Sequence, residues 1–217
     1  MEWLDSIKEP AIKRTMLRDE VKDYLLEAIL NGNLKPEERI VETKVAKHLK
    51  VSQAPVREAL RDLEHMGVLY SEPYKGTFVK KLSVAELQER YIVRAALEET
   101  AVRLAVPKLT QKNIGEMQKC IEEMIQAAEA GDLRTMIAVD VQFHRTVIKS
   151  SGNHFLLSVW EKINPGSWTL FSTHNAKKDL PDLARRHYEV LDALLSGDPL
   201  HAGTIIRQHI EELAPKP

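Results

Sequence analysis

Four side chains in the C-terminal half of the sequence have the chemistry to bind a metal ion together. Asp140 and His144 are four residues apart, so on a helix both project from one face. His187 and His209 follow on separate segments, each beside apolar positions of a helical pattern. Neutral imidazoles and a carboxylate suit a divalent metal, with Zn²⁺ as the first expectation and Ni²⁺, Mn²⁺ or Fe²⁺ as alternatives. Such an ion would keep positions open for water or a substrate oxygen.

The spacing alone leaves a plainer interpretation open. An aspartate and a histidine four residues apart are common by chance, and the chain has eight histidines. We expect most of the other histidines at the surface: His48, His65, His154, His174 and His201. A metal site therefore requires a fold that brings three helices together.

The elements around these residues are all expected to be helices. Ser83 and Glu86 have the spacing of a capping box that opens a long helix, which Pro107 ends. Further helices are expected over residues 110–130, 132–150, 153–163, 179–196 and 199–213, with a break or kink at 165–166. Six or seven helices with short loops predict an antiparallel bundle, in which inward-facing side chains can converge on a central site.

A second stretch with functional potential runs from Val51 to Leu63. Ser52 suits a helix N-cap and Pro55 suits the first turn. One face repeats apolar residues at core spacing, namely Val56, Leu60 and Leu63, and a neighbouring face repeats polar ones, namely Gln53, Arg57 and Arg61. Alone, this pattern fits an ordinary amphipathic helix equally well.

The flanks of this stretch favour DNA binding. Residues 42–50 predict a short helix separated from it by a tight turn, which is the helix-turn-helix pattern. Residues 68–71 and 77–80 predict two strands around a loop that holds Lys75 and Gly76, as in the wing of a winged helix. A helix from about Thr15 to Asn31 comes first, after an arm over residues 1–14 with little order of its own.

The run VSQAPVREALRDLEHMGVLY, with GNLKP before it and PYKGTFV after it, resembles the DNA-binding domain of GntR-type bacterial transcription regulators over roughly residues 15–80. The sequence departs from that family at Gln53, where arginine is usual, at Ala54, where threonine is usual, and at Glu37, where glycine is usual. The departure at Gln53 concerns which base is read. The resemblance implies a DNA-contacting set on the helix-turn-helix and wing: Thr43, Lys44, Ser52, Gln53, Arg57, Arg61, Lys75 and Gly76.

The C-terminal part resembles the FCD domain, the helical effector domain of the FadR subfamily of GntR regulators, over roughly residues 84–213. The matching pattern has three parts. The first is DVQFHRTVIKSSGN, the second is H-x4-D-A-L-x2-G-D, which begins at His187, and the third is His209, 22 residues after His187. The resemblance implies that Asp140, His144, His187 and His209 hold a divalent metal under a pocket for small carboxylic acids. The metal-free branch that binds acyl-CoA is correspondingly disfavoured.

The same resemblance places Arg94 in an R-x3-E motif with Glu98. Arg94 could pair with a carboxylate of the effector, or it could form a surface pair with Glu98 four residues on. Asn153 matches the S-G-N of the family, and a helix N-cap is its expected role.

Composition sets limits on these interpretations. The formal net charge of the 217 residues is −1, so attraction to DNA must come from local patches. The single cysteine, Cys120, cannot form an intrachain disulfide, which suits a reducing cytoplasm. No long apolar run and no signal-peptide pattern is present, so we expect a cytoplasmic protein without a membrane segment.

The sequence therefore predicts a mainly α protein. An arm (1–14) and a winged helix-turn-helix domain with a small β-hairpin wing (15–81) precede an all-α antiparallel bundle for effector binding and dimerisation (82–217). The expected function is transcription regulation, as a homodimer on a pseudo-palindromic operator that a small carboxylic acid controls. Two alternatives stay open: a metal-dependent hydrolase, and a regulator whose metal is purely structural.

Overall fold

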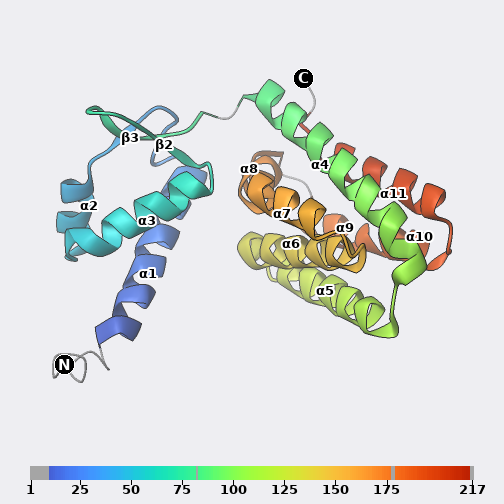
Figure 1. Cartoon of the computed structure of the whole chain (residues 1–217). Helices are drawn as coiled ribbons and strands as arrows, with labels where there is room; N and C mark the ends of the chain where they lie inside the picture. The colour runs from blue at the N-terminus through green and yellow to red at the C-terminus, as the bar shows by residue number, and fades with distance from the viewer. Residues whose placement is uncertain (1–9, 82, 177–178, 216–217) are drawn as a thin grey trace. The chain divides into compact units, whose positions relative to one another are not determined.

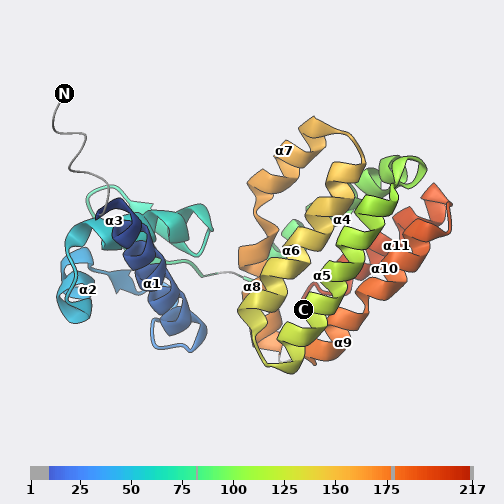
Figure 2. The ribbon, with the colours of Figure 1, turned by 90° about the horizontal axis from the view of Figure 1, so that it is seen from below.

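The computed structural model describes residues 10–81, 83–176 and 179–215. The chain divides into two compact units, Met1–Lys81 and Leu82–Pro217. Figure 1 and Figure 2 show each unit from two directions. Within the described ranges, no helix has both the length and the apolar character needed to cross a membrane.

The N-terminal unit is a winged helix-turn-helix. Its helices are α1 (Pro10–Leu30), α2 (Glu42–Leu49) and α3 (Gln53–His65), and its strands are β1 (Arg39–Ile40), β2 (Leu69–Glu72) and β3 (Gly76–Val79) (Figure 1). The strands form an antiparallel sheet in the order β1-β3-β2, with Tyr70 opposite Phe78 and their rings stacked at 5.5 Å. The predicted hairpin wing is confirmed, and β1 adds a strand at its edge.

The apolar face of α3 holds this unit together. Val56, Leu60 and Leu63 are buried as predicted, and α3 packs against α1. Ser52 occupies the N-cap position, but its hydroxyl makes no capping hydrogen bond, contrary to expectation. The tight turn before α3 is closed instead by the backbone N–H of Val51, which donates to the carbonyl of Ala46 at 3.0 Å.

The first helix is longer than predicted. It begins at Pro10 rather than near Thr15, so the end of the expected arm is helical. Proline lacks the N–H that a first helical turn leaves unpaired, which lets a helix begin there. Residues 1–9 of the expected arm lie outside the described part of the chain.

The C-terminal unit is a helical bundle with more and shorter helices than the six or seven expected. Its elements are α4 (Val84–Ala105), a 3-10 turn η2 (Val106–Lys108), α5 (Gln111–Glu129), α6 (Leu133–Ser150), α7 (His154–Ile163), α8 (Pro165–Ala176), α9 (Leu180–Arg185), α10 (His187–Leu195) and α11 (Pro199–Glu211). Helices α4 and α11 pack along each other, as do α5 and α6 (Figures 1 and 2). The capping box of Ser83 and Glu86 and the cap of Asn153 are confirmed.

Two local differences explain the additional helices. The helix expected over residues 179–196 is divided at Arg186 into α9 and α10, which places His187 at the start of α10. Pro165 opens α8 rather than only breaking the chain, because Asn164 ends α7 in the left-handed region (φ 47°) and proline fits a first turn.

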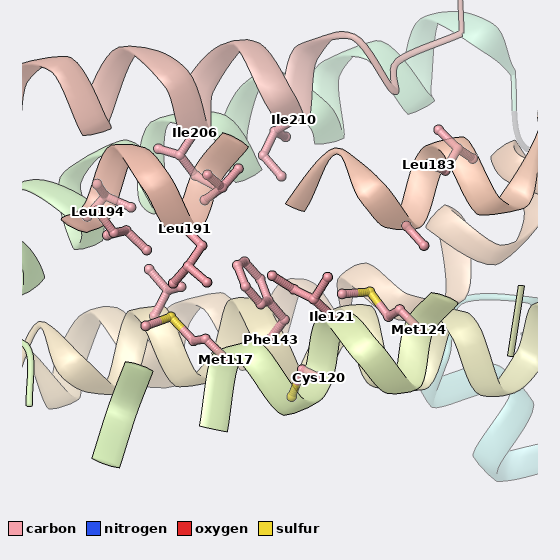
Figure 3. Packing of buried hydrophobic residues seen from close by; sticks show 14 of the residues in the cluster. Met117, Cys120, Ile121, Met124, Phe143, Leu183, Leu191, Leu194, Ile206 and Ile210 are labelled. Atoms are coloured by element: carbon pink, nitrogen blue, oxygen red, sulfur yellow. The ribbon is translucent and has the colours of Figure 1, made fainter. Parts of the chain in front are cut away.

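The main core of the bundle lies between α5, α6 and the C-terminal helices. Figure 3 shows Met117, Ile121 and Met124 of α5 facing Phe143 of α6, with side chains of α9, α10 and α11 on the other side, among them Leu183, Leu191 and Ile206. Cys120 is buried in the same cluster, as expected of a small structural residue. This core fixes the faces of α6, α10 and α11 that carry the four predicted ligands.

Candidate metal centre and nucleic-acid interface

Three histidines from three helices converge inside the bundle. One ring nitrogen of each lies within 4.8 Å of the others, and all three side chains are buried: His144 of α6, His187 of α10 and His209 of α11. The ring centroids of His187 and His209 are 4.5 Å apart. The fold therefore brings together residues that are up to 65 positions apart in sequence.

Asp140 lies one helical turn before His144 and faces the same cluster. Its Oδ1 is 3.1 Å from Nε2 of His187 and 3.7 Å from Nε2 of His144. Burial alone would raise the pKa of Asp140, but the charge of His144 and further polar contacts hold that pKa well below its usual range. Asp140 is thus an ionised carboxylate, the form that binds a cation.

A second layer of groups orients the histidines. Nδ1 of His144 is 2.5 Å from Oε2 of Glu98, and Nδ1 of His187 is 3.1 Å from the carbonyl of Ala184. Each imidazole therefore presents its Nε2 to the cluster. A carboxylate or carbonyl behind the distal nitrogen is the usual support of a metal-bound histidine.

Glu98 also bonds to Arg94 on its own helix, α4, and to Trp160 of α7. Its Oε1 accepts hydrogen bonds from Nε of Arg94 at 2.7 Å and from the indole N–H of Trp160 at 2.9 Å. Burial alone would raise the pKa of Glu98, but the charges of His144 and Arg94 outweigh this effect and lower that pKa to about 2. Glu98 is therefore a fully engaged, ionised anchor for His144.

Several buried polar atoms around the cluster have no hydrogen-bond partner. They are Nε2 of His144, Nε2 of His209, Oδ2 of Asp140 and Nη2 of Arg94. Unpaired buried polar atoms are costly, so such a concentration indicates a place for a further charged group. Burial and the neighbouring His187 keep the pKa of His209 well below its usual range, so this imidazole is neutral and can bind a metal directly. Burial lowers the pKa of His144, but the carboxylate of Glu98 outweighs it and raises that pKa, so His144 must release a proton when a metal binds. The donor set fits a divalent metal.

Arg94 was predicted either to bind a carboxylate of the effector or to form a surface pair with Glu98, and its environment differs in part from both. It does pair with Glu98, but the pair is fully buried rather than at the surface. Its Nη1 donates to the hydroxyl of Thr169 at 3.2 Å, and its Nη2 is 3.6 Å from Oδ2 of Asp140. One guanidinium nitrogen thus remains available beside the cluster.

The hollow at this cluster is small. Its volume is about 10 Å³, and its lining includes Thr169 and Thr173 of α8, Arg186 and Leu213. That is the room of about one water molecule. Any organic ligand must displace side chains of this wall when it enters.

The sequence singled out the four residues that the fold brings together, but it missed part of their surroundings. Glu98 appeared only as a partner of Arg94, whereas it also orients His144. Trp160 and Thr169 were not connected to the site at all. The R-x3-E spacing was the one available signal, because the contacts of Trp160 and Thr169 join residues that no local pattern relates.

The predicted DNA-contacting residues lie on the exposed side of the N-terminal unit. Gly76 is half-buried, and the other seven residues are exposed: Thr43, Lys44, Ser52, Gln53, Arg57, Arg61 and Lys75. Gly76 has φ +109°, and a Cβ there would lie 3.0 Å from Nε of Arg39, so Arg39 of β1 lies across the wing. Among the described side chains, no contact joins Lys75 to the basic residues of α3, and its ammonium pairs with Glu72 at 2.7 Å.

The start of α2 is tied to the middle of α3. Nε and Nη2 of Arg57 donate to the two carboxylate oxygens of Glu42, at 3.1 and 2.8 Å. Arg61 has no ion pair with any residue that the structure describes. Neither Arg39 nor Glu42 was singled out from the sequence, because each depends on contacts across the fold.

Each of the two units matches a known protein family. Residues 17–79 match the family described as bacterial regulatory proteins, gntR family, and residues 89–212 match the FCD domain. A probable D-xylose utilization operon transcriptional repressor of Paenarthrobacter nicotinovorans is 33% identical over 204 residues, which cover 94% of this chain and 90% of that protein. The HTH-type transcriptional regulator McbR of Escherichia coli is 31% identical over 189 residues, covering 85% of this chain and 83% of McbR.

Solved structures show the same fold. The E. coli McbR/YncC structure has a TM-score of 0.66 at 28% identity, and the match covers 90% of this chain and 94% of that one. A putative GntR regulator from Rhodococcus has a TM-score of 0.67 at 21% identity, with 90% and 94% covered. These relatives are transcription regulators, so the hydrolase alternative is wrong. The chain belongs to the GntR family of bacterial transcription regulators, and its FCD domain is that of the FadR subfamily.

Proposed function

We propose that this protein binds a specific operator and that a small carboxylic acid, bound at a divalent metal in the helical unit, controls its affinity for that operator. The observation that carries the proposal is the convergence of Asp140, His144, His187 and His209 on one buried point. Such a cluster is joined in one chain to a winged helix-turn-helix. A sensor and a reader of DNA in one molecule make a ligand-responsive regulator.

Asp140, His144, His187 and His209 are the proposed ligands. A bound divalent ion would supply a positive charge with positions left for a carboxylate oxygen, and we expect Zn²⁺ first. Glu98 and the carbonyl of Ala184 would hold His144 and His187 in the orientation that binding requires. Asp140 offsets part of the positive charge at the site.

Arg94 is the proposed second contact for the acid. Its Nη2 is buried, makes no hydrogen bond and lies 3.6 Å from Oδ2 of Asp140, and a guanidinium suits a carboxylate oxygen. Thr169 lies beside it and lines the same hollow. Because the hollow holds only about 10 Å³, entry of the acid must move part of its wall, of which α8 supplies Thr169 and Thr173. That movement is the proposed origin of the response.

The N-terminal unit is proposed to read DNA as one half of a homodimer on a pseudo-palindromic operator. Gln53 suits adenine, and Arg57 and Arg61 suit guanine, in the major groove. Thr43, Lys44 and Ser52 are placed to contact phosphates, and the wing with Lys75 and Gly76 to contact the backbone or minor groove. Repression, relieved by the acid, is the expected mode, and the related D-xylose operon protein is named a repressor.

The two sites can communicate only if the acid binds one arrangement of the protein better than another. The change in operator affinity then equals that difference in binding free energy.

A thermal-shift screen with small carboxylic acids tests the sensing half of the proposal. A ligand at about 100 times its Kd should stabilise the metal-loaded protein by about 2.7 kcal/mol. Metal analysis of the purified protein, made in parallel, should find an ion. We expect a stabilising acid whose effect disappears after chelation, and no stabilising acid in either form would contradict the proposal.

A purely structural metal is the second candidate. The small volume of the hollow favours it, since an ion fits without rearrangement. In that case chelation lowers the melting temperature, and no acid changes either the melting temperature or operator binding. The same screen therefore separates the two candidates.

A further inference from the structure

One ion pair of the helix-turn-helix has no role in the function proposed above. Glu42, the first residue of α2, accepts two hydrogen bonds from Arg57 of α3, one on each carboxylate oxygen. The side chains are 25% and 56% exposed. An exposed pair of this kind contributes little to stability in general. Its position on the helix that faces DNA suggests a role in recognition instead.

The geometry of the pair leaves part of Arg57 available. A guanidinium has five N–H groups in a fixed plane. Glu42 uses the edge formed by Nε and Nη2, so the opposite edge, formed by Nη1 and the second proton of Nη2, stays available. That edge matches the O6 and N7 acceptors of guanine, the usual partners of arginine in the major groove. Glu42 therefore fixes the direction of Arg57 without blocking its contact with a base.

The charge of Glu42 acts in the same direction. A carboxylate beside Arg57 offsets the cation that would otherwise attract any phosphate. Non-specific affinity should therefore be lower with Glu42 present, whereas the directed contact with guanine is kept. Discrimination between two sequences depends on this difference, not on affinity alone.

We propose that Glu42 is a specificity-determining positioning residue, which holds Arg57 in the orientation that reads guanine. The inference rests on the proposed function, in that α3 must enter the major groove of an operator. Glu42 itself need not touch DNA. Arg61, which lacks such a partner among the described residues, should rely on DNA alone for its orientation.

The test uses the full-length protein and a randomised duplex DNA library. Selection with the wild type yields a preferred duplex. Selection with Arg57→Lys, which keeps the positive charge but lacks the planar fork of arginine, identifies the base pair whose preference depends on Arg57. Dissociation constants are then measured for the preferred duplex, for the duplex changed at that base pair, and for a scrambled duplex. The variants are Glu42→Gln and Glu42→Ala. Glu58→Gln is the matched control, because it removes one exposed acid of α3 with no described contact to Arg57.

Glu42→Gln and Glu42→Ala should reduce discrimination at the Arg57-dependent base pair about tenfold, which is the size of one bidentate base contact. Preferences at other positions should stay, and the scrambled duplex should bind equally well or more tightly. Glu58→Gln should keep the wild-type discrimination.

Wild-type discrimination in both Glu42 variants would overturn the inference. A uniform loss at every position, together with a lower melting temperature, would also overturn it, because Glu42 would then only stabilise the fold. If the wild type selects no sequence at all, the proposed operator binding fails first, and the inference fails with it.

Discussion

Single residues decide the chemistry of both units. In the helical unit the decisive property is burial: His144, His187, His209 and Asp140 are each at most 4% exposed. Burial makes a charge or an unpaired nitrogen costly unless another group compensates it. In the N-terminal unit the side chains proposed to contact DNA are exposed, apart from the half-buried Gly76. Polar side chains therefore have different surroundings in the two units.

The first prediction at this scale separates the two sites. His187→Ala should lower the metal content from roughly one ion per chain to near zero and abolish the response to acid, because it removes a ligand from the centre of the cluster. Specific operator binding should persist. Arg57→Ala should do the reverse, losing specific binding and keeping the metal. Metal analysis and an electrophoretic mobility assay measure both properties.

His201 provides the control for the metal site. It is an exposed histidine of α11, the helix that also carries His209. His201→Ala should leave the metal content unchanged. A substitution that removes both metal and operator binding from a folded protein would contradict the separation of the two sites.

A second residue-scale prediction concerns Glu37. It lies where the family usually has glycine, and its φ of 68° is in the left-handed region. A side chain there costs about 1–2 kcal/mol, and glycine avoids most of that cost but loses more entropy on folding. Glu37→Gly should therefore raise the free energy of unfolding by about 1 kcal/mol.

Denaturant titration of the purified protein measures this difference. Glu37→Ala is the matched control, because it removes the same charge and keeps the Cβ that causes the strain. It should show no comparable gain. An equal gain in both variants would attribute the effect to charge rather than to the backbone.

At the scale of elements, α4 carries the polar side chains that support the proposed metal site. Arg94 and Glu98 are fully buried on it, and they connect to α6 through His144, to α7 through Trp160 and to α8 through Thr169. A helix whose buried polar side chains bond to three neighbouring helices has one preferred position relative to them. Movement of α7 or α8 would therefore change the position of α4 through these hydrogen bonds.

The third prediction tests this arrangement. Glu98→Ala should lower the free energy of unfolding by about 3–5 kcal/mol, because the buried charge of Arg94 loses its closest partner and keeps only Asp140, at 3.6 Å. Metal affinity should fall as well, since His144 loses its support. Chemical denaturation and metal titration give the two values.

Glu116 of α5 supplies the comparison. Its pair with Lys112 is exposed, with an N–O distance of 3.9 Å. Glu116→Ala should change stability by at most about 0.5 kcal/mol. Equal effects of the two substitutions would mean that the buried network contributes no more than a surface pair.

At the scale of the whole molecule, the proposed function requires the helical unit to influence the winged unit. Each unit has its own core, so each can fold around its own apolar residues. Under the proposed function, communication depends on the change that the acid would produce in the bundle.

The fourth prediction follows for the metal-loaded and chelated forms. With metal, the acid found by thermal shift should weaken binding to the selected operator, by the ratio of its affinities for the two arrangements. After chelation, the acid should no longer change operator binding. Fluorescence anisotropy with labelled operator measures both conditions. An undiminished response after chelation would contradict metal-anchored sensing.

Much of this protein could be derived from its sequence because the signals are local. The apolar spacing of Val56, Leu60 and Leu63 fixed the buried face of α3, and the pair Asp140 and His144 had to share one face of α6. Capping residues such as Ser83 and Asn153 marked helix starts correctly, since a cap acts within one turn. Resemblance to the family added the winged fold, which the structure has, and the proposed ligand set.

Only the tertiary structure decided the rest, because the deciding contacts join distant parts of the chain. No local pattern shows that Arg94 and Glu98 are buried, or that Glu98 orients His144 46 residues later. The same holds for Glu42 and Arg57, whose pairing depends on the turn between α2 and α3. Sequence periodicity determines which face a side chain occupies, whereas packing determines what that face meets.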